Sequence, residues 1–353
     1  MLFCGDFVFP YSYNSSTFQG LGEEFINEPK LLNFESTLKF LNREKVTNGI
    51  ALYSDVAVLN ILKYLNVQCV SLANNHIGDF TFDPEDFITT FIKNEIHTLG
   101  FGKNIEQASL PFINHAERMI VLSFGWEVIR CRLAGKNKMG VNPYRYEWVE
   151  QQVDLYKKKF PTYKLILFLH WNYEFENLPH PADRKFSHYL IDKGVDGIFG
   201  HHPHIINSVE VYNGKVIFYS LGNFYFPQGK YDNCYVKFRK DALYGISVHY
   251  TGELEHLLIY YHKQEVDGKA IKLECSFTLE EFLTSGICVN INGLSDSDYI
   301  DFYKQNHFHK RKLLPIYKDF TNLGLNRCLD KWVKIRQLPI DILSQYLHVK
   351  RKN

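Results

Sequence analysis

The segment IINSVEVYNGKVIFYSLGNF, residues 205–224, decides the fold class of this chain. It contains two runs rich in β-forming residues on either side of Asn213-Gly214, and this dipeptide is the strongest short-range signal of a two-residue hairpin turn. Further β-type runs follow at 243–250 and 257–262, so we expect a second set of strands that is partly antiparallel. These strands predict a sandwich of sheets and not a simple doubly wound sheet.

Upstream of that segment, short apolar runs alternate with amphipathic stretches, which is typical of a layered α/β protein. We predict buried strands over residues 2–5, 68–73, 119–124, 164–170 and 197–200. We predict helices over residues 55–65, with Asp55 as the N-cap, and over 146–160 and 183–193. Strands should therefore lie inside and helices outside.

From about residue 295 the chain becomes helical in pattern and basic. After Phe302 there are twelve Lys or Arg residues against three Asp. We predict a main domain over 1–290 and a basic, mainly helical extension over 291–353. The run from His307 to Lys312 is expected to be a solvated helix face; no nucleic-acid-binding motif accompanies it, so an anionic polymer, a membrane headgroup or a partner protein is favoured over nucleic acid.

The bulk composition describes an ordinary globular chain. It has 353 residues, 45% of them hydrophobic, and a formal net charge of +1, which gives no general bias towards nucleic acid or membranes. The seven cysteines are scattered and form no CxxC pair, which indicates reduced thiols. Because we find no signal peptide and no long apolar run, we expect a cytoplasmic protein without a transmembrane segment, whose basic tail could contact the inner membrane face.

Polar side chains stand where the predicted strands end. Such ends, and the loops that follow them, are where the sites of layered α/β proteins assemble. The candidates are Asp6, Glu35, Asn75, His76, His170, His202 and His204.

This set of residues suits a pair of divalent cations. Such cations lie about 3.5–4 Å apart in two-metal sites, share a bridging carboxylate and accept imidazole and oxygen ligands. The HxH spacing of His202 and His204 lets one loop address both cations. The GHHPH run leaves the register open, because His201 stands next to Gly200; we favour His202.

The order of these motifs resembles the bacterial capsule-synthesis or poly-gamma-glutamate-synthesis proteins, which belong to the calcineurin-like metallophosphoesterase superfamily. The resemblance covers about residues 1–225. It rests on GDF at Gly5, NFE at Asn33, LANNH at Leu72, GFGKN at Gly100, VLSF at Val121, HWNYEFENLPHPADR at His170, GHHPHI at Gly200 and IFYSLGNF at Ile217.

The resemblance implies a four-layer α/β/β/α sandwich of two mixed sheets, with the metal site along one edge of the facing sheets. It also implies two cations, of the Mn, Fe or Zn type, that activate a water. The implied roles are Asp6 and His204 on one cation, Asn75, His170 and His202 on the other, Glu35 as the bridge, and His76 as general acid or phosphoryl-oxygen contact.

One position departs from the superfamily pattern. The superfamily has DxH at its first strand, whereas Asp6 is followed by Val8, which removes one imidazole. We therefore expect the first cation to bind weakly or to be absent, so that only one is held tightly. Glu35 replaces the usual aspartate and can still bridge through its longer side chain.

Four further residues are candidates for substrate binding. Trp171, Glu174 and Arg184 lie on the segment that leaves a candidate ligand, where stacking and charge could recognise a substrate. Asn223 either donates to a phosphoryl oxygen or closes a turn beside Gly222.

Two functions are compatible with these residues. The first is a metal-dependent phosphoesterase-like hydrolase that takes an anionic polymer or a phosphate ester, in the making or processing of a capsular polysaccharide or poly-gamma-glutamate. The second is a non-hydrolytic, metal-binding component that binds an anionic chain together with other polymer-synthesis proteins.

Overall fold

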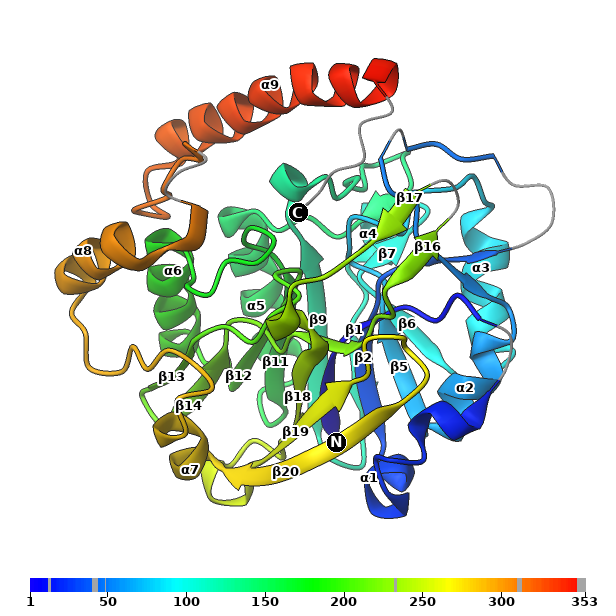
Figure 1. Cartoon of the computed structure of the whole chain (residues 1–353). Coiled ribbons are helices and arrows are strands. Elements are labelled where there is room, and N and C mark those ends of the chain that lie inside the picture. The colour runs from blue at the N-terminus through cyan, green and yellow to red at the C-terminus, as the bar shows by residue number, and fades with distance from the viewer. Residues whose placement is uncertain (12–13, 40–43, 48, 232–233, 310–312, 348–353) are drawn as a thin grey trace.

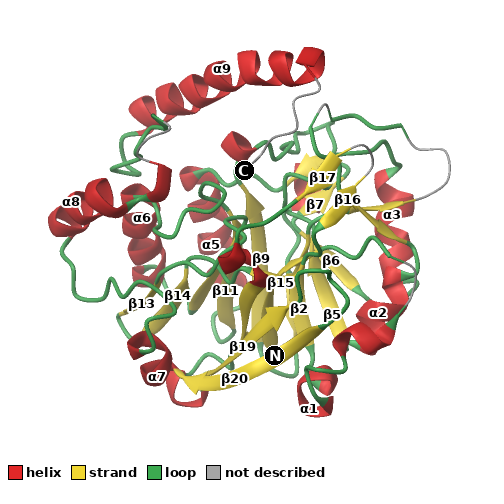
Figure 2. Ribbon diagram, in the orientation of Figure 1, coloured by secondary structure: helices red, strands yellow, loops and turns green. Residues whose placement is uncertain are grey.

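Two mixed sheets form the centre of the protein (Figures 1 and 2). The computed structural model describes residues 1–353 apart from 12–13, 40–43, 48, 232–233, 310–312 and 348–353. In the large sheet the strand order is β20 (Ile271–Thr278), β19 (Leu258–Gln264), β18 (Tyr244–His249), β1 (Leu2–Phe7), β2 (Lys30–Phe34), β5 (Val67–Ser71) and β6 (His97–Leu99), with β15 (Asn223–Tyr225) also paired to β1. The second sheet has the order β13 (Val209–Tyr212), β14 (Lys215–Phe218), β12 (Gly197–His201), β11 (Lys164–His170), β9 (Met119–Gly125) and β8 (Phe112–Asn114).

Short strand pairs and helices complete the described residues. The pairs are β3 (Thr37–Lys39) with β4 (Tyr53–Asp55), β7 (Phe101–Gly102) with β10 (Gly140–Val141), and β16 (Gly229–Tyr231) with β17 (Cys234–Val236). The helices are α1 (Glu23–Asn27), α2 (Val58–Tyr64), α3 (Pro84–Ile92), α4 (Ile105–Ala108), α5 (Tyr146–Lys159), α6 (Pro181–Asp192), α7 (Leu279–Thr284), α8 (Asp296–Asn306) and α9 (Leu323–Leu347). Four 3-10 turns are η1 (Ser15–Phe18), η2 (Glu127–Ile129), η3 (Lys240–Leu243) and η4 (Leu254–His256).

An apolar core joins the two sheets. The ring of Phe3 on β1 stacks on that of Phe199 on β12 with centroids 4.3 Å apart, and both are fully buried together with neighbours from each sheet. Burial of such rings stabilises the pairing of the sheets by removing apolar surface from water. Helices α2 and α3 contact strands of the large sheet, and α5 contacts β11 of the second sheet. The mixed α/β class is thus confirmed, while the full four-layer order stays a prediction.

The predicted strands correspond to β1, β5, β9, β11 and β12, with ends displaced by no more than two residues. The hairpin is also confirmed, because β13 and β14 pair antiparallel around Asn213-Gly214. Both turn residues have left-handed φ angles, 46° and 70°, as a type I′ turn requires.

Two expectations were wrong or incomplete. Helix α2 begins at Val58 and not after an Asp55 cap: Asp55 ends β4, and its carboxylate accepts the Ala57 N–H at 2.8 Å in the turn before the helix. Strand β20 was not predicted, because at the edge of the large sheet it buries little besides Ile271 and carries charged and polar residues on its exposed side.

The predicted extension contains α8 and α9. Helix α8 packs on α6 and buries Tyr299 and Tyr303, whereas α9 lies along the outside of the molecule (Figure 1). His307 and His309 are buried, so this part of the expected solvated face was wrong, and residues 310–312 of the run lie outside the described residues. The boundary at 290 stays a prediction.

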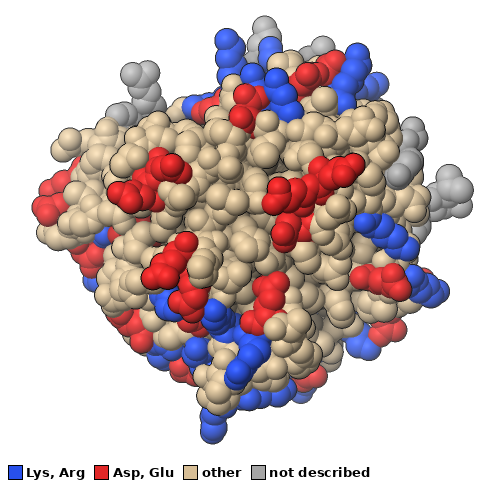
Figure 3. All heavy atoms as spheres, turned by 90° about the horizontal axis from the view of Figure 1, so that it is seen from below, with Lys and Arg blue, Asp and Glu red and all other residues tan. Residues whose placement is uncertain are grey.

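Charges of both signs are interspersed on the face of the molecule seen from below (Figure 3), in keeping with the balanced total. None of the helices in the described ranges combines the length and the apolar character needed to cross a membrane.

Candidate metal centre

The candidate site lies where parallel strands of both sheets end. In the large sheet β1 runs parallel to β2, with Asp6 opposite Asn33, and β2 runs parallel to β5. In the second sheet β11 runs parallel to β12, with His170 opposite His201. Because the carboxyl ends of parallel strands meet at one edge of a sheet, the polar residues that follow these strands converge.

Two groups of possible ligands share one carboxylate. Asp6, Glu35 and His204 form the first group, and Glu35, His170 and His202 form the second; within each group the ligand atoms lie within 4.8 Å of one another. All of these side chains are buried. Asn75 belongs beside the second group, since its Oδ1 lies 2.7 Å from His170 Nε2. The structure thus brings together all the ligands that the sequence predicted, with Glu35 between the two groups.

The buried polar atoms of this centre fit a cation. Among the described residues, Glu35 Oε1 and His202 Nδ1 are buried and have no hydrogen-bond partner. Such orphaned atoms are costly, because burial removes their water without replacing it. A divalent cation held by these carboxylate and imidazole groups would satisfy them, so the donor set fits the cations that the resemblance implies.

The imidazoles of the second group are held neutral. Burial lowers the pKa of both His170 and His202 well below the usual value, and the neighbouring histidines add to the effect. A neutral imidazole is the form that binds a metal ion. Burial raises the pKa of Glu35, and the nearby Asp6 carboxylate raises it further. A bound cation would oppose this, because it favours the charged carboxylate.

Asp6 and His204 form an ion pair in the first group. His204 Nδ1 lies 3.2 Å from Asp6 Oδ2, and His204 Nε2 lies 3.7 Å from Glu35 Oε1. Burial alone would lower the pKa of His204, but the carboxylates of Glu35 and Asp6 outweigh it and raise the pKa. Burial would raise the pKa of Asp6, but the hydrogen bond and charge of His204 hold it low. A cation on His204 would therefore have to displace its proton.

The loop that carries His202 and His204 is strained. Both residues have positive φ angles, 94° and 59°, and they flank Pro203. A non-glycine residue in this region costs about 1–3 kcal/mol and persists where the surrounding structure fixes it. One fixing contact is the hydrogen bond from the His202 N–H to Asp6 Oδ2, at 3.3 Å. The two imidazoles are therefore presented by a loop that the fold holds in place.

His76 stands beside the ligands and, like Asn75, is partly exposed. Its side chain is 17% exposed, and its Nε2 lies 4.0 Å from Glu35 Oε1. On the other side of the ring, Nδ1 lies 2.7 Å from Asp79 Oδ2, which also accepts the Leu52 N–H. Asp79 therefore fixes the orientation of His76 with Nε2 towards the centre. Asp79 was not among the predicted site residues, although an acidic residue three positions after a candidate histidine is a usable signal.

Two asparagines that were not predicted as site residues position the ligands. Asn33 Nδ2 donates to Asp6 Oδ1 at 2.7 Å and lies 3.3 Å from His170 Nδ1, so it links ligands from both sheets. Asn74 donates to Asn33 Oδ1 and accepts the His76 N–H, which sets the loop after β5. Partners behind a ligand fix its orientation and tune its affinity for the metal.

Asn223 has a similar place on the other side of the centre. Its Oδ1 lies 3.0 Å from His204 Nδ1, and its Nδ2 donates to the Ala242 carbonyl at 2.9 Å. Both ends of the amide are used within the protein, so Asn223 orients His204, and its contact with a phosphoryl oxygen stays a prediction.

The alternative register through His201 is wrong. His201 Nε2 lies 3.1 Å from the Cys4 carbonyl, and its ring centroid lies 3.9 Å from that of Phe168. The side chain therefore points into the core between the sheets, and it belongs to neither ligand group.

Trp171 and Arg184 are not placed to bind substrate. Trp171 is 1% exposed and donates its indole N–H to the Tyr219 carbonyl, so neither ring face can stack on a substrate. Arg184 is buried and binds the Glu210 carboxylate at 2.5–3.2 Å. Trp171 also explains Gly200, where a Cβ atom would lie 2.4 Å from the indole nitrogen.

Glu174 is exposed, and its charge raises the pKa of both Glu35 and His204. It is therefore the one candidate from this loop whose side chain acts on the centre from the solvent side. Its role towards a substrate stays a prediction.

Val8 offers no ligand to the first group. It is fully buried in an apolar cluster with Leu52, Phe226, Tyr231 and Val236. The position that carries an imidazole in the superfamily pattern is thus part of the hydrophobic packing in this chain.

Comparisons with known proteins identify the family of this chain. The family model described as "Bacterial capsule synthesis protein PGA_cap" matches residues 5–228. The chain belongs to this family. All the candidate ligands of this PGA_cap protein lie inside the matched region.

Several curated proteins are similar over the same region. The "PGA biosynthesis protein CapA" of Bacillus subtilis (strain 168) is 30% identical over 238 residues, which cover 65% of this chain and 61% of the relative. The "Capsule biosynthesis protein CapA" of Bacillus anthracis is 30% identical over 233 residues, 64% of this chain and 54% of the relative. A "Probable polyglutamine synthesis accessory protein" of Mycobacterium tuberculosis (strain ATCC 25618 / H37Rv) is 28% identical over 209 residues, 55% and 54%. The chain thus matches between half and two thirds of the length of these relatives.

Proposed function

We propose that this PGA_cap protein is a metal-dependent hydrolase of the phosphoesterase type that acts in the making or processing of a cell-surface polymer. The polymer in this proposal is a capsular polysaccharide or poly-gamma-glutamate; the names of the similar proteins, which refer to PGA and capsule biosynthesis, support it. In this role the protein would work together with other polymer-synthesis proteins.

The shared position of Glu35 carries the proposal. One buried carboxylate reaches two ligand groups, which come from strand ends of two different sheets. A purely structural metal site closes around one ion with four ligands, whereas a shared carboxylate between two open groups is typical of two-metal hydrolases. Cations of the Mn, Fe or Zn type, held by Asp6, Glu35, Asn75, His170, His202 and His204, would supply Lewis-acid stabilisation of charge on a phosphoryl group.

The residues around this centre have distinct tasks. His76, oriented by Asp79, directs Nε2 towards the centre, where it can donate a proton to a leaving oxygen or contact a phosphoryl oxygen. Asn33 and Asn223 hold ligands in place, so that little rearrangement is needed when a substrate arrives. The exposed Glu174 carboxylate repels negative charge on its side of the centre, so an anionic substrate is favoured to approach from another side.

The direct test is a turnover assay with defined metals. The purified chain should hydrolyse a member of a panel of phosphomonoesters and phosphodiesters when Mn²⁺ is added, and a chelator should abolish the reaction. His170→Ala should lower turnover by about a hundredfold or more, since even outer partners of a metal contribute about 10–100-fold. His256→Ala, a change at an exposed histidine on η4, is the matched control and should behave like the wild type. Unchanged turnover in His170→Ala would refute its role as a ligand.

A second function is favoured by one observation. Because Val8 is buried in an apolar cluster, the first ligand group has no imidazole besides that of His204. If the protein binds a single cation and catalyses no hydrolysis, it would act as a metal-binding component of a polymer-synthesis complex and would itself bind the anionic polymer. Metal analysis distinguishes the two: one bound ion and no activity on any ester of the panel would support this second function.

A further inference from the structure

A cavity of about 320 Å³ lies beside the first ligand group, outside the metal centre itself. Its wall includes Ile205, which directly follows His204, and Phe175, whose ring centroid lies 6.5 Å from that of His204. The cavity therefore adjoins the centre through the same loop that presents a ligand. Its volume falls within the range of ligand pockets, about 300–1,000 Å³.

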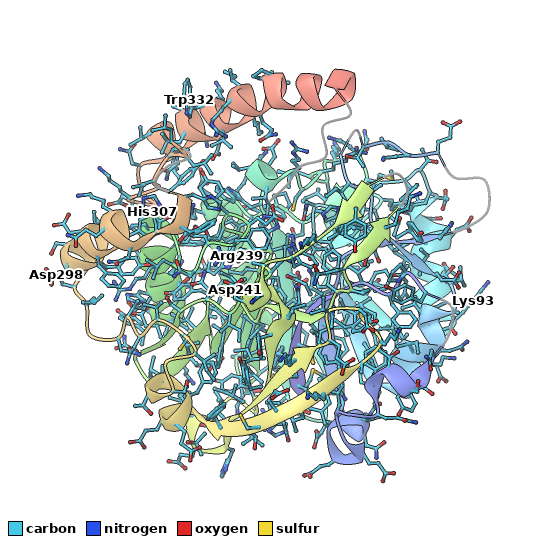
Figure 4. All side chains as sticks on the ribbon, in the orientation of Figure 1. Lys93, Arg239, Asp241, Asp298, His307 and Trp332 are labelled. Atoms are coloured by element: carbon cyan, nitrogen blue, oxygen red, sulfur yellow. The ribbon has the colours of Figure 1, made fainter. Side chains whose placement is uncertain are left out.

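The turn η3 ties this cavity to the metal centre a second time. Phe238, just before η3, has its ring 5.7 Å from the His204 ring, and the Ala242 carbonyl in η3 accepts the Asn223 amide that orients His204. Arg239 and Asp241 of the same segment line the cavity and lie next to each other in Figure 4. A ligand in the cavity would thus rest on the segment that supports a metal ligand.

Aromatic rings supply much of the cavity surface. Tyr244 on β18 and Tyr261 on β19 are stacked with centroids 5.4 Å apart and an angle of 7° between the rings, and both are partly exposed. Phe308 follows α8 and is 44% exposed. Such rings have apolar faces, and Tyr adds a hydroxyl at its edge, so they accept ligands that are apolar on one side and polar at the rim.

The two charged residues that line the cavity, Arg239 and Asp241, cancel each other, while Lys263 lies at its edge with Nζ 5.2 Å from the Tyr244 ring. Arg239 donates to the Asp241 carboxylate at 3.0 and 2.6 Å, and its guanidinium group lies over the Phe308 ring at 4.5 Å. The pair is partly exposed and gives no net charge, so it would neither attract nor repel a polyanion at distance. Its free N–H groups and carboxylate lone pairs, with the amides of Asn177 and Asn306, still offer hydrogen bonds to hydroxyl groups.

We infer that this cavity is a subsite for an uncharged saccharide unit of the polymer that the metal centre processes. Sugar rings have apolar C–H faces and a rim of hydroxyl groups, which match stacked aromatic rings bordered by a neutral Arg–Asp pair and amides. A poly-gamma-glutamate chain has a carboxylate on every residue and would need several unpaired cations, whereas Arg239 is paired with Asp241 and Lys263 at the edge offers a single charge. The inference rests on the proposed function and names a glycan as its substrate class.

The test is a binding measurement on the full chain that is independent of turnover. Binding of uncharged six-sugar chains (maltohexaose, cellohexaose and hexa-N-acetylchitohexaose) and of a gamma-linked glutamate oligomer is measured by calorimetric titration in the presence of chelator. One of the saccharides should bind, and Tyr261→Ala should weaken it by about tenfold, the effect of losing one aromatic contact. Tyr261→Phe keeps the ring and should bind like the wild type. Tyr235→Ala, at an exposed tyrosine on β17 away from the cavity, is the control and should also be unchanged.

The possible results separate this inference from the proposed function. If no saccharide binds at millimolar concentration while metal-dependent ester hydrolysis is observed, the subsite is refuted and the proposed function stands. If the glutamate oligomer binds instead and Tyr261→Ala weakens it, the saccharide class is wrong. If a saccharide binds but Tyr261→Ala and Tyr235→Ala bind it equally well, the location in this cavity is wrong. Saccharide binding that is lost in Tyr261→Ala, in a chain without hydrolytic activity, supports the subsite and refutes the hydrolase.

Discussion

Replacement of Arg184 by methionine should lower the free energy of unfolding by about 3 kcal/mol. Arg184 is buried on α6, and its guanidinium group binds the buried Glu210 carboxylate of β13. It also donates to the Leu294 carbonyl and contacts Asp296, both from the segment around the start of α8. Methionine keeps much of the side-chain volume but leaves Glu210 without its cation.

The size of the effect follows from what remains around Glu210. Removing one partner of a buried ion pair costs about 3–5 kcal/mol, because the other charge is left uncompensated. Glu210 keeps the Tyr219 hydroxyl at 2.8 Å and His188 Nε2 at 3.0 Å, which places the loss at the lower end of that range. Asp296 is half exposed, and solvent screens its pairing with Arg184, so it adds little.

The assay is equilibrium unfolding in urea, followed by circular dichroism. The double variant Arg184→Met with Glu210→Gln removes both charges and should recover most of the loss, since Gln still accepts from Tyr219. If Arg184→Met lowers the free energy of unfolding by less than about 1 kcal/mol, the Arg184–Glu210 pair does not stabilise the fold as a buried ion pair, because exposed pairs typically contribute about that amount. A loss of turnover at unchanged stability would restore the substrate-binding role that the sequence suggested for Arg184.

Three further predictions concern single side chains. Burial raises the pKa of Asp183 to about 7, so between about pH 4 and pH 7 the folded chain holds a proton there that the unfolded chain has lost, and the free energy of unfolding should fall with rising pH by at most about 1.4 kcal/mol per pH unit. Asp183→Asn should flatten this dependence in urea unfolding at a series of pH values, and parallel curves for the variant and the wild type would contradict it. Asp79→Asn should lower turnover by about 10–100-fold with unchanged metal content, because His76 loses its anionic orienting partner; equal loss of metal would show that Asp79 supports the ligands instead. Asn223→Ala should weaken Mn²⁺ binding by about tenfold in a titration, because His204 loses its orienting amide, and an unchanged dissociation constant would count against that role.

Much of the fold was readable because the buried strands are continuous apolar runs. β9 and β11 lie in the interior of the second sheet, where nearly every side chain is buried, so hydrophobicity alone marks them. The start of α2 was mispredicted because Asp55 belongs to strand β4. Its carboxylate accepts the Ala57 N–H in the turn before the helix and does not cap the first turn of the helix. Edge strand β20 is mostly exposed and contains charged and polar residues between its apolar ones, so its sequence lacks the continuous apolar run that marks a buried strand.

The candidate ligands stand out in the sequence because each lies at or just after a strand end, where a polar residue interrupts an apolar run. The positioning residues could not be predicted, because their partners are set by tertiary structure: Asn33 meets His170 across 137 positions of sequence. The burial of Trp171 and Arg184 argues against the substrate-binding role that the sequence suggested for them. Arg184 donates to the Leu294 carbonyl 110 positions away, and Trp171 donates to the Tyr219 carbonyl 48 positions away, so the local sequence does not show that either side chain is buried.

The family match ends at residue 228, yet strand β1, which carries Asp6, pairs along its first half with β18 at residues 244–249. A fragment that keeps residues 1–228 would expose the backbone of β1 on that side, and unpaired strand edges recruit other chains. Such a fragment should aggregate even though it holds every candidate ligand. Shortened versions of this protein made for crystallography or enzymology need at least the strands through β20 to remain monodisperse.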